Sequence, residues 1–83
     1  MRRDPEYFGD RELELLYIAK KLNDALRIES LMQEAGIDYA VEADNYVGGV
    51  IFRSERIGAF FYVLPEDVGA ARDLLERNRF RVS

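Results

Sequence analysis

The side chains that most often carry out catalysis are missing from this sequence. Its 83 residues contain neither Cys nor His, which excludes a thiol nucleophile and a disulfide scaffold and removes the most common general base. Ser30 is expected on a helix, and Ser54 and Ser83 have no histidine to activate them. We therefore expect no enzymatic activity and no cofactor.

Carboxylates are the remaining donors for a metal ion. Asp38, Glu42 and Asp44 alternate along a predicted strand and share one of its faces, with Asn45 next in the chain. Oxygen ligands at this spacing could hold a calcium or magnesium ion weakly, whereas acids on a solvated strand face are far more common. We expect no metal site.

A glycine-containing stretch between residues 44 and 56 is the best candidate for a ligand site. Gly48 and Gly49 lead into an apparent strand rather than a helix, so they do not form a phosphate-binding loop. A hairpin turn is one interpretation, and a ligand loop is the other, with Tyr46 stacking on the ligand and Arg53 or Arg56 binding an anion. The residues of this candidate loop are Asp44, Asn45, Tyr46, Gly48, Gly49, Arg53 and Arg56.

RNA binding is a further hypothesis, because aromatic side chains on a sheet can stack on bases. The stretch 56–63 matches the basic, small and aromatic positions of an RNA-recognition pattern at Arg56, Ala59 and Phe60 but departs from it elsewhere. Residues 13–52 carry three basic and seven acidic side chains, a balance that repels phosphate. We expect no nucleic-acid partner.

Arginines gather near the C-terminal end of the chain. Pairs four residues apart, such as Asp73 and Arg77, are typical of a solvated helix face, although arginine is also enriched at protein interfaces. The candidate interface combines three of these arginines with two aromatic residues of a predicted strand: Phe60, Tyr62, Arg77, Arg79 and Arg81.

The first half of the chain predicts a strand and a helix. Residues 13–20 are apolar on both faces, as in a central strand, with a helix as the alternative. One face holds Leu13, Leu15, Tyr17 and Ala19, and the other holds Leu16 and Ile18. Asn23 or Asp24 is expected to cap a helix that ends at Gly36, which suits a left-handed C-terminal position.

The second half predicts four elements: a strand over 38–44, a hairpin with arms 50–53 and 59–64 joined by 54–58, a helix over 65–78, and a short last strand over 80–82. Asp44-Asn45 and Gly48-Gly49 are expected turns. Pro65 and the two acids after it suit the first turn of a helix, and Asn78 is expected to end it.

This order of elements predicts an α+β fold, a ferredoxin-like two-layer sandwich in which an antiparallel sheet carries two helices on one face. Residues 1–12 mix charges with Pro5 and Gly9 and are expected to form an N-terminal tail. Residues 13–83 are expected to form a single domain. A chain of this length builds one shared core.

The predicted elements resemble a small bacterial domain family described as a prokaryotic signal-transducing protein of unknown function. The resemblance covers roughly residues 13–76 and rests on Asn23-Asp24-Ala25, Ile28, Leu31, Glu34-Ala35-Gly36-Ile37, Gly48-Gly49, and Val63-Leu64-Pro65-Glu66-Asp67 with Ala71 and Leu74-Leu75. The chain departs from the family at Asp24-Ala25 and Arg27, where the usual pair is Glu-Ala, and in the aromatic and glycine residues after Asp44. The resemblance implies a compact fold distantly similar to the PII-type regulators and no catalytic residue.

The surplus of apolar residues predicts a partner. Two helices cover one side of a sheet, yet the strands are apolar on both sides, and monomers rarely leave large apolar patches exposed. The tail with Tyr7 and Phe8, a second copy of the chain, or a ligand could cover the other side. We expect a homodimer through the sheet face or an edge strand, since two-fold association is the most common assembly.

The same patterns suggest where the protein works. Asp4-Pro5-Glu6 stands where a signal peptide needs an apolar run, and no apolar stretch approaches the roughly 20 residues of a spanning helix. We expect a cytoplasmic, bacterial-type protein without a membrane span, acting as a regulatory or interaction module. A small-molecule or anion sensor with its ligand at the 44–56 loop is the alternative.

Overall fold

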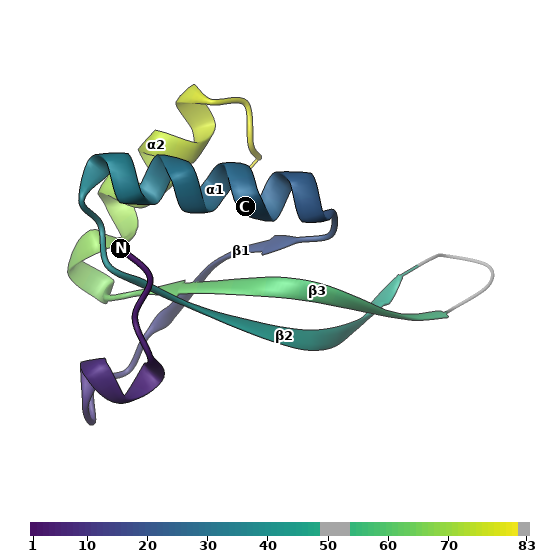
Figure 1. Cartoon of the computed structure of the whole chain (residues 1–83), viewed down its shortest axis with the longest axis horizontal. Helices are drawn as coiled ribbons and strands as arrows, with labels where there is room; N and C mark the ends of the chain where they lie inside the picture. The colour runs from purple at the N-terminus through teal and green to yellow at the C-terminus, as the bar shows by residue number, and fades with distance from the viewer. Residues whose placement is uncertain (49–53, 82–83) are drawn as a thin grey trace.

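The computed structural model describes residues 1–48 and 54–81, and the side chains of 1–44 and 57–81. Its elements are η1 (Pro5–Phe8), β1 (Glu14–Ala19), α1 (Leu22–Ala35), β2 (Tyr39–Gly48), β3 (Ser54–Val63), η2 (Pro65–Asp67) and α2 (Val68–Arg77). Figure 1 shows the two helices above a twisted sheet. The protein is thus an α+β fold with a three-stranded antiparallel sheet and two helices in its described part.

The sheet has the strand order β1-β3-β2, and both neighbouring pairs are antiparallel. β2 and β3 pair continuously from Tyr39 opposite Val63 to Gly48 opposite Ser54. The predicted turn at Asp44-Asn45 and the predicted connection 54–58 are therefore wrong, because both segments are strand. The ladder of hydrogen bonds along two ten-residue strands outweighs the local turn preference of Asp and Asn, and the predicted arm 50–53 lies outside the described residues.

Helix α1 ends as predicted and begins earlier than predicted. Gly36 is left-handed (φ 70°), its N–H donates to the Gln33 carbonyl at 3.1 Å, and the Ile37 N–H donates to the Met32 carbonyl at 3.0 Å. This is the Schellman arrangement. At the other end the N-cap is Lys21, without a side-chain capping bond, so the predicted cap at Asn23 or Asp24 is wrong. Lys21 is the last extended residue, which places Asn23 and Asp24 inside the first turn.

Helix α2 also ends where the sequence predicts, at Asn78. Arg79 takes the left-handed conformation (φ 71°), and the N–H of Phe80 donates to the Leu75 carbonyl at 2.9 Å. Phe80 is buried, with its ring edge-on to that of Tyr17 at 5.7 Å between centroids. Because its N–H and its ring complete the helix end and the core, neither Phe80 nor Arg81 is part of a strand; Val82, the last residue of the predicted strand, lies outside the described residues.

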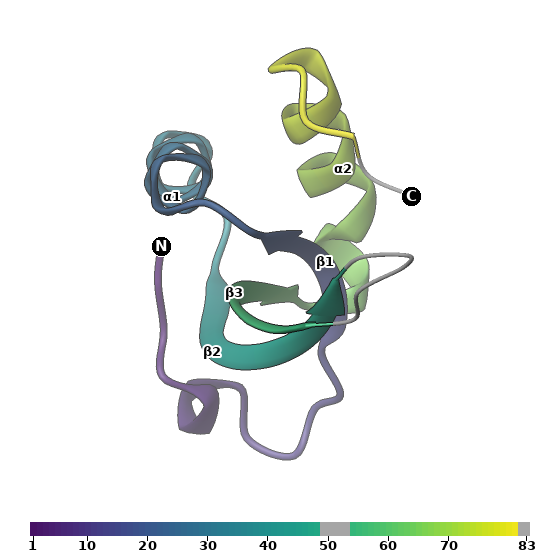
Figure 2. The same ribbon diagram turned by 90° about the vertical axis from the view of Figure 1, so that its right-hand side faces the viewer.

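The core lies between the helices and one face of the sheet (Figure 2). Its fully buried side chains come from both helices and from the sheet: Ile28 and Met32 from α1, Tyr39, Phe61 and Val63 from the sheet, and Ala71 and Leu75 from α2. Figure 2 also shows that residues 1–12, which we call the N-terminal segment, pass under the sheet, on the face away from the helices. That second face is where the functional question arises.

Candidate functional site: the open face of the sheet

The face of the sheet opposite the helices is defined by the strand register. Residues directly opposite each other on neighbouring strands project to the same side. Tyr62 stands between Leu15 and Ala40, Phe60 stands between Ile18 and Glu42, and Gly58 stands opposite Asp44. We call these eight residues the open face: Leu15, Ile18, Ala40, Glu42, Asp44, Gly58, Phe60 and Tyr62.

A β-bulge decides which side chains of β1 reach the open face. The register shifts between Leu15 and Tyr17, so Leu16 and Tyr17 both belong to the helix side, Leu16 at 4% exposure in the core and Tyr17 packed against it. The predicted strict alternation along β1 is therefore wrong, since an extra residue in one strand breaks the two-residue period. Leu15, 43% exposed, and Ile18 remain on the open face.

The N-terminal segment covers one end of the open face. The N–H of Arg3 donates to the Tyr39 carbonyl at 2.8 Å, and the N–H of Tyr39 donates to the Met1 carbonyl at 3.1 Å, which adds the segment to the edge of β2 as a parallel bridge. Phe8 and Ala40 are buried, and neither belongs to the core cluster under the helices. A small apolar contact layer thus forms on this side of the sheet.

Ionic contacts hold this segment at both ends. Arg3 Nε lies 3.1 Å from Asp38 Oδ1, and the Arg3 guanidinium lies 4.4 Å from the centre of the Tyr7 ring. Arg11 forms a two-bonded ion pair with Glu66, with Nη1 to Oε2 at 2.8 Å. The bonds from Arg11 lower the pKa of Glu66 below its ordinary value.

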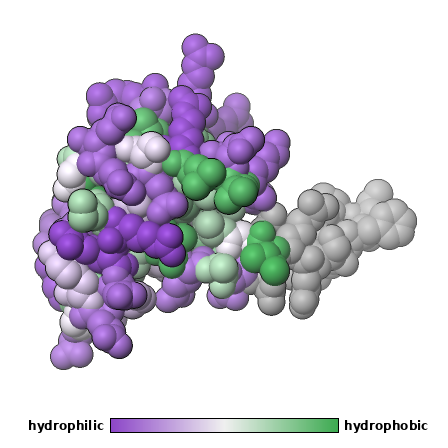
Figure 3. All heavy atoms as spheres, viewed as in Figure 1, coloured by the Kyte–Doolittle hydropathy of each residue, from purple (hydrophilic) through white to green (hydrophobic). Residues whose placement is uncertain are grey.

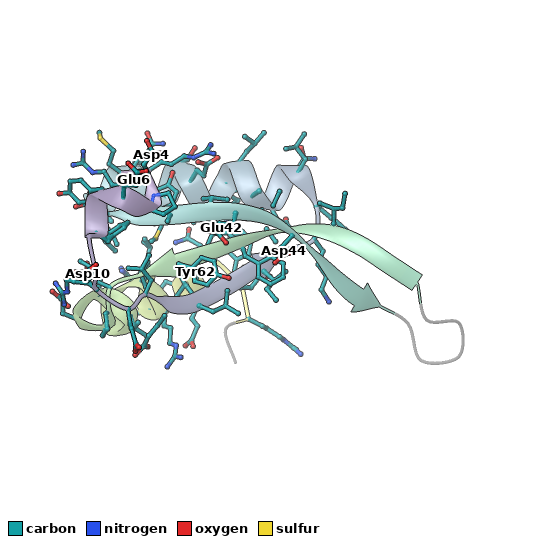
Figure 4. All side chains as sticks on the ribbon, turned by 90° about the horizontal axis from the view of Figure 1, so that it is seen from below. Asp4, Glu6, Asp10, Glu42, Asp44 and Tyr62 are labelled. Carbon is teal, nitrogen blue, oxygen red and sulfur yellow. The ribbon has the colours of Figure 1, made fainter. Side chains whose placement is uncertain are left out.

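Acidic side chains lie on the open face and on the segment beside it. Glu42 and Asp44 extend from β2, and three more acids come from the N-terminal segment: Asp4, Glu6 and Asp10. In Figure 4, viewed from the open side, Glu42 and Asp44 lie beside Tyr62, whereas Asp4, Glu6 and Asp10 lie farther from it, on the N-terminal segment. We call these five carboxylates the acidic rim. Burial raises the pKa of Tyr62, and the charges of Glu42 and Asp44 raise it further.

Nearby arginines pair with other carboxylates. Arg2 lies 3.7 Å from Glu29, and Arg3 and Arg11 bind Asp38 and Glu66 as described above. The three carboxylates considered for a weak cation site also separate here, because Asp38 precedes β2 and binds the N-terminal segment. Among the described residues no three acidic side chains converge on a metal-binding position.

A hollow lies at the border between the N-terminal segment and the sheet. Its volume is about 270 Å³, and it is lined by Pro5, Leu13, Ala40, Glu42 and Tyr62. The lining combines apolar surface with one carboxylate and one phenol. Such a hollow can receive an apolar chain that ends in a positive charge.

The structure divides the predicted site residues among several places. Asp44, Asn45, Tyr46 and Gly48 are in β2 and Arg56 is in β3, directly opposite Tyr46, whereas Gly49 and Arg53 lie outside the described residues. The ligand-loop hypothesis remains a prediction.

Phe60 and Tyr62 of the predicted interface are half-buried on the open face. Arg77 pairs with Asp73 at 3.0 Å, as expected from their spacing. Arg81 instead lines a hollow of about 330 Å³ along β1, together with Leu15 and Lys20.

Sequence reasoning did not predict that the N-terminal segment contributes to this surface. Asp4, Glu6 and Asp10 stand in a stretch without any period, so only the fold places their segment under the face of the sheet that carries Glu42 and Asp44. A second apolar area lies on the helix side, where Figure 3 shows hydrophobic residues near the start of α1. Its exposed side chains are Leu22, Leu26 and Ile57.

Comparisons with known proteins return no relative for this chain. No family model, no curated protein and no solved structure matches it. Neither helix in the described part of the chain combines the length and the apolar content needed to cross a membrane.

Proposed function

We propose that this chain is a non-enzymatic interaction module that acts as a homodimer, joined through the outer edge of β1. The observation that carries this proposal is the position of β1. It is an apolar strand with β3 on one side, and none of the described residues pairs with its other edge. An apolar edge strand readily pairs with another chain.

The ferredoxin-like assignment supports the same place of contact. The described elements follow the order expected for that fold up to its last strand, which would be the fourth of the sheet. A second copy could supply the neighbour that β1 lacks among the described residues. The resemblance over residues 13–76 to a signal-transducing family agrees with a regulatory role for such a dimer.

The bulge selects one register for this pairing. A two-fold axis between Leu16 and Tyr17 places Leu15 of one copy opposite Ile18 of the other. Both residues belong to the open face of their own copy, so the apolar surfaces of the two copies join. Leu15 is 43% exposed in the single chain and would gain the most from this contact.

Sedimentation velocity across a wide range of concentrations tests the dimer, with an expected mass twice the 9.6 kDa of one chain. The substitution Leu15→Glu places a charge against Ile18 and is expected to give monomers. Adding Ile18→Lys pairs each Glu with a Lys of the other copy, so the double variant is expected to restore the dimer. Leu26→Glu is the matched control, since Leu26 is 53% exposed on α1.

Circular dichroism establishes that each variant is folded. A wild-type monomer at every concentration contradicts the dimer. A dimer that survives Leu15→Glu, or that Leu26→Glu disrupts equally, contradicts the β1 contact. Failure of the double variant to recover the dimer contradicts the register.

A further inference from the structure

We propose that the open face and its acidic rim bind an apolar, arginine-containing segment of a partner protein. This goes beyond the homodimer, because it concerns the face of the sheet and not the outer edge of β1, and it concerns a different partner. The inference rests on three features that the fold brings together: an apolar sheet surface, a hollow of side-chain size, and the carboxylate of Glu42 beside both.

The apolar part of the surface is contributed by two strands. Phe60 and Tyr62 are half-buried in the middle of the face, between Leu15 and Ile18 on β1 and the short or acidic side chains of β2. The N-terminal segment covers Ala40 but leaves Leu15 43% exposed. A second chain laid across this face would bury aromatic and aliphatic surface, which is typical of the centre of a protein interface.

The charged part of the surface determines the sign of the charge that a partner must carry. All five carboxylates of the acidic rim belong to exposed residues. The arginines of the N-terminal segment pair with Glu29, Asp38 and Glu66, outside the rim. Glu42 is exposed, stands opposite Phe60 and lines the hollow beside Tyr62, so the open face presents negative charge next to an apolar centre, and the complementary partner is positively charged and apolar.

The hollow beside Tyr62 indicates how such a partner is anchored. Its volume of about 270 Å³ lies just below the roughly 300–1,000 Å³ of pockets that enclose a free small molecule. One long side chain suits it better. The stem of an arginine can lie against Ala40, Leu13 and Pro5, while its guanidinium stacks on Tyr62 and forms paired hydrogen bonds with Glu42.

Other occupants fit this surface less well. Two copies of the chain meeting face to face would bring one acidic rim against the other, which costs free energy. A nucleic acid would place phosphates near the same carboxylates. A basic, apolar peptide meets neither obstacle.

The test uses the full chain and three labelled peptides of equal length. One alternates Arg with Leu, one alternates Glu with Leu, and one alternates Arg with Gly. Fluorescence anisotropy is expected to show binding of the Arg–Leu peptide, at least tenfold weaker binding of the Arg–Gly peptide, and none of the Glu–Leu peptide. Amide chemical shifts from nuclear magnetic resonance are expected to change on β3 around Phe60 and Tyr62.

Two charge reversals locate the contact. Glu42→Lys is expected to weaken binding of the Arg–Leu peptide by about tenfold or more. Glu34→Lys makes the same change in charge at an exposed position of α1, away from the open face, and is expected to change affinity by less than about twofold. Equal loss in both variants, equal binding of the Arg–Gly peptide, or shifts confined to the helices overturn the proposal.

The sedimentation of the peptide complex separates this proposal from the dimer. A monomer that binds the Arg–Leu peptide on the open face contradicts the homodimer alone. A dimer that does not bind it contradicts the peptide site alone.

Discussion

Tyr39→Phe removes one hydroxyl group that connects the sheet to α1. Tyr39 is fully buried at the start of β2, and its hydroxyl donates to Glu29 Oε1 at 2.9 Å. Gln33 Nε2 donates to the same hydroxyl at 3.4 Å. Because phenylalanine keeps the ring and its packing, the substitution isolates these polar contacts.

The expected loss follows from the nature of the acceptor. A hydrogen bond to a charged group contributes about 1.5–3 kcal/mol. Glu29 retains 20% side-chain exposure and lies 3.7 Å from Arg2, so water and Arg2 can partly replace the lost donor. We expect a loss of about 1.5 kcal/mol, which lowers the melting temperature by about 6–12 °C for a domain of this size.

The effect of Tyr39→Phe should also depend on pH in a defined direction. Burial raises the pKa of Tyr39 to about 12, and the bond to Glu29 raises it while the bond from Gln33 lowers it. A folded pKa above the unfolded value of about 10 gives stability that is complete below pH 10 and is lost as the pH rises toward 12. Over this range the wild type should lose about 2–3 kcal/mol relative to Tyr39→Phe.

Urea unfolding followed by circular dichroism, repeated from pH 7 to pH 12, measures both effects. The wild type should be more stable at neutral pH, and the difference should vanish and then reverse above pH 10. Tyr7→Phe serves as the control, since Tyr7 is 56% exposed. Equal stability at pH 7, or a difference that does not change with pH, would refute the assignment of this hydrogen bond.

Two further predictions concern the helix ends and the N-terminal segment. Gly36→Ala should destabilise the protein by about 1–2 kcal/mol, because φ is 70° there, whereas Arg79→Gly should stabilise it by up to about 1 kcal/mol for the same reason. Opposite signs in urea unfolding support both Schellman endings, and equal signs contradict them. Phe8→Ala should cost about 3–5 kcal/mol, because the Phe8 side chain is buried. Tyr7→Ala should cost less, and negligible losses for both in thermal unfolding would show that the segment does not dock.

Much of the local structure follows from short-range patterns in the sequence. The apolar stripe that ends at Gly36 and Ile37 predicts the end of α1, because the Schellman bonds involve only residues within one turn. The same holds for the stripe of α2 and its end at Asn78. The both-sided apolar pattern of 13–20 correctly predicts a strand in place of a longer helix. The expectation of a central strand is wrong for the described sheet, because β1 lies at its edge and only β3 pairs with it there.

Predictions that depend on pairing between distant strands are less successful. Asp44 and Asn45 carry a turn preference, but Gly58 and Ile57 provide partners that keep them in β2. The sequence around Phe80 predicts a short strand, yet packing against Tyr17 in the core holds Phe80 at the end of α2. In each case the deciding contact lies far along the chain, where local preference carries no information.

The sequence alone determined the class of this protein: a small α+β domain without thiol or imidazole chemistry, with more apolar surface than two helices cover. Only the tertiary structure decided where that surface lies and what surrounds it. The bulge in β1 turns Leu16 inward and leaves Leu15 and Ile18 outward, because one extra residue breaks the alternation. The N-terminal segment then lies under the face of the sheet that carries Glu42 and Asp44, since backbone pairing at Tyr39 and the ion pairs of Arg3 and Arg11 hold it across the sheet.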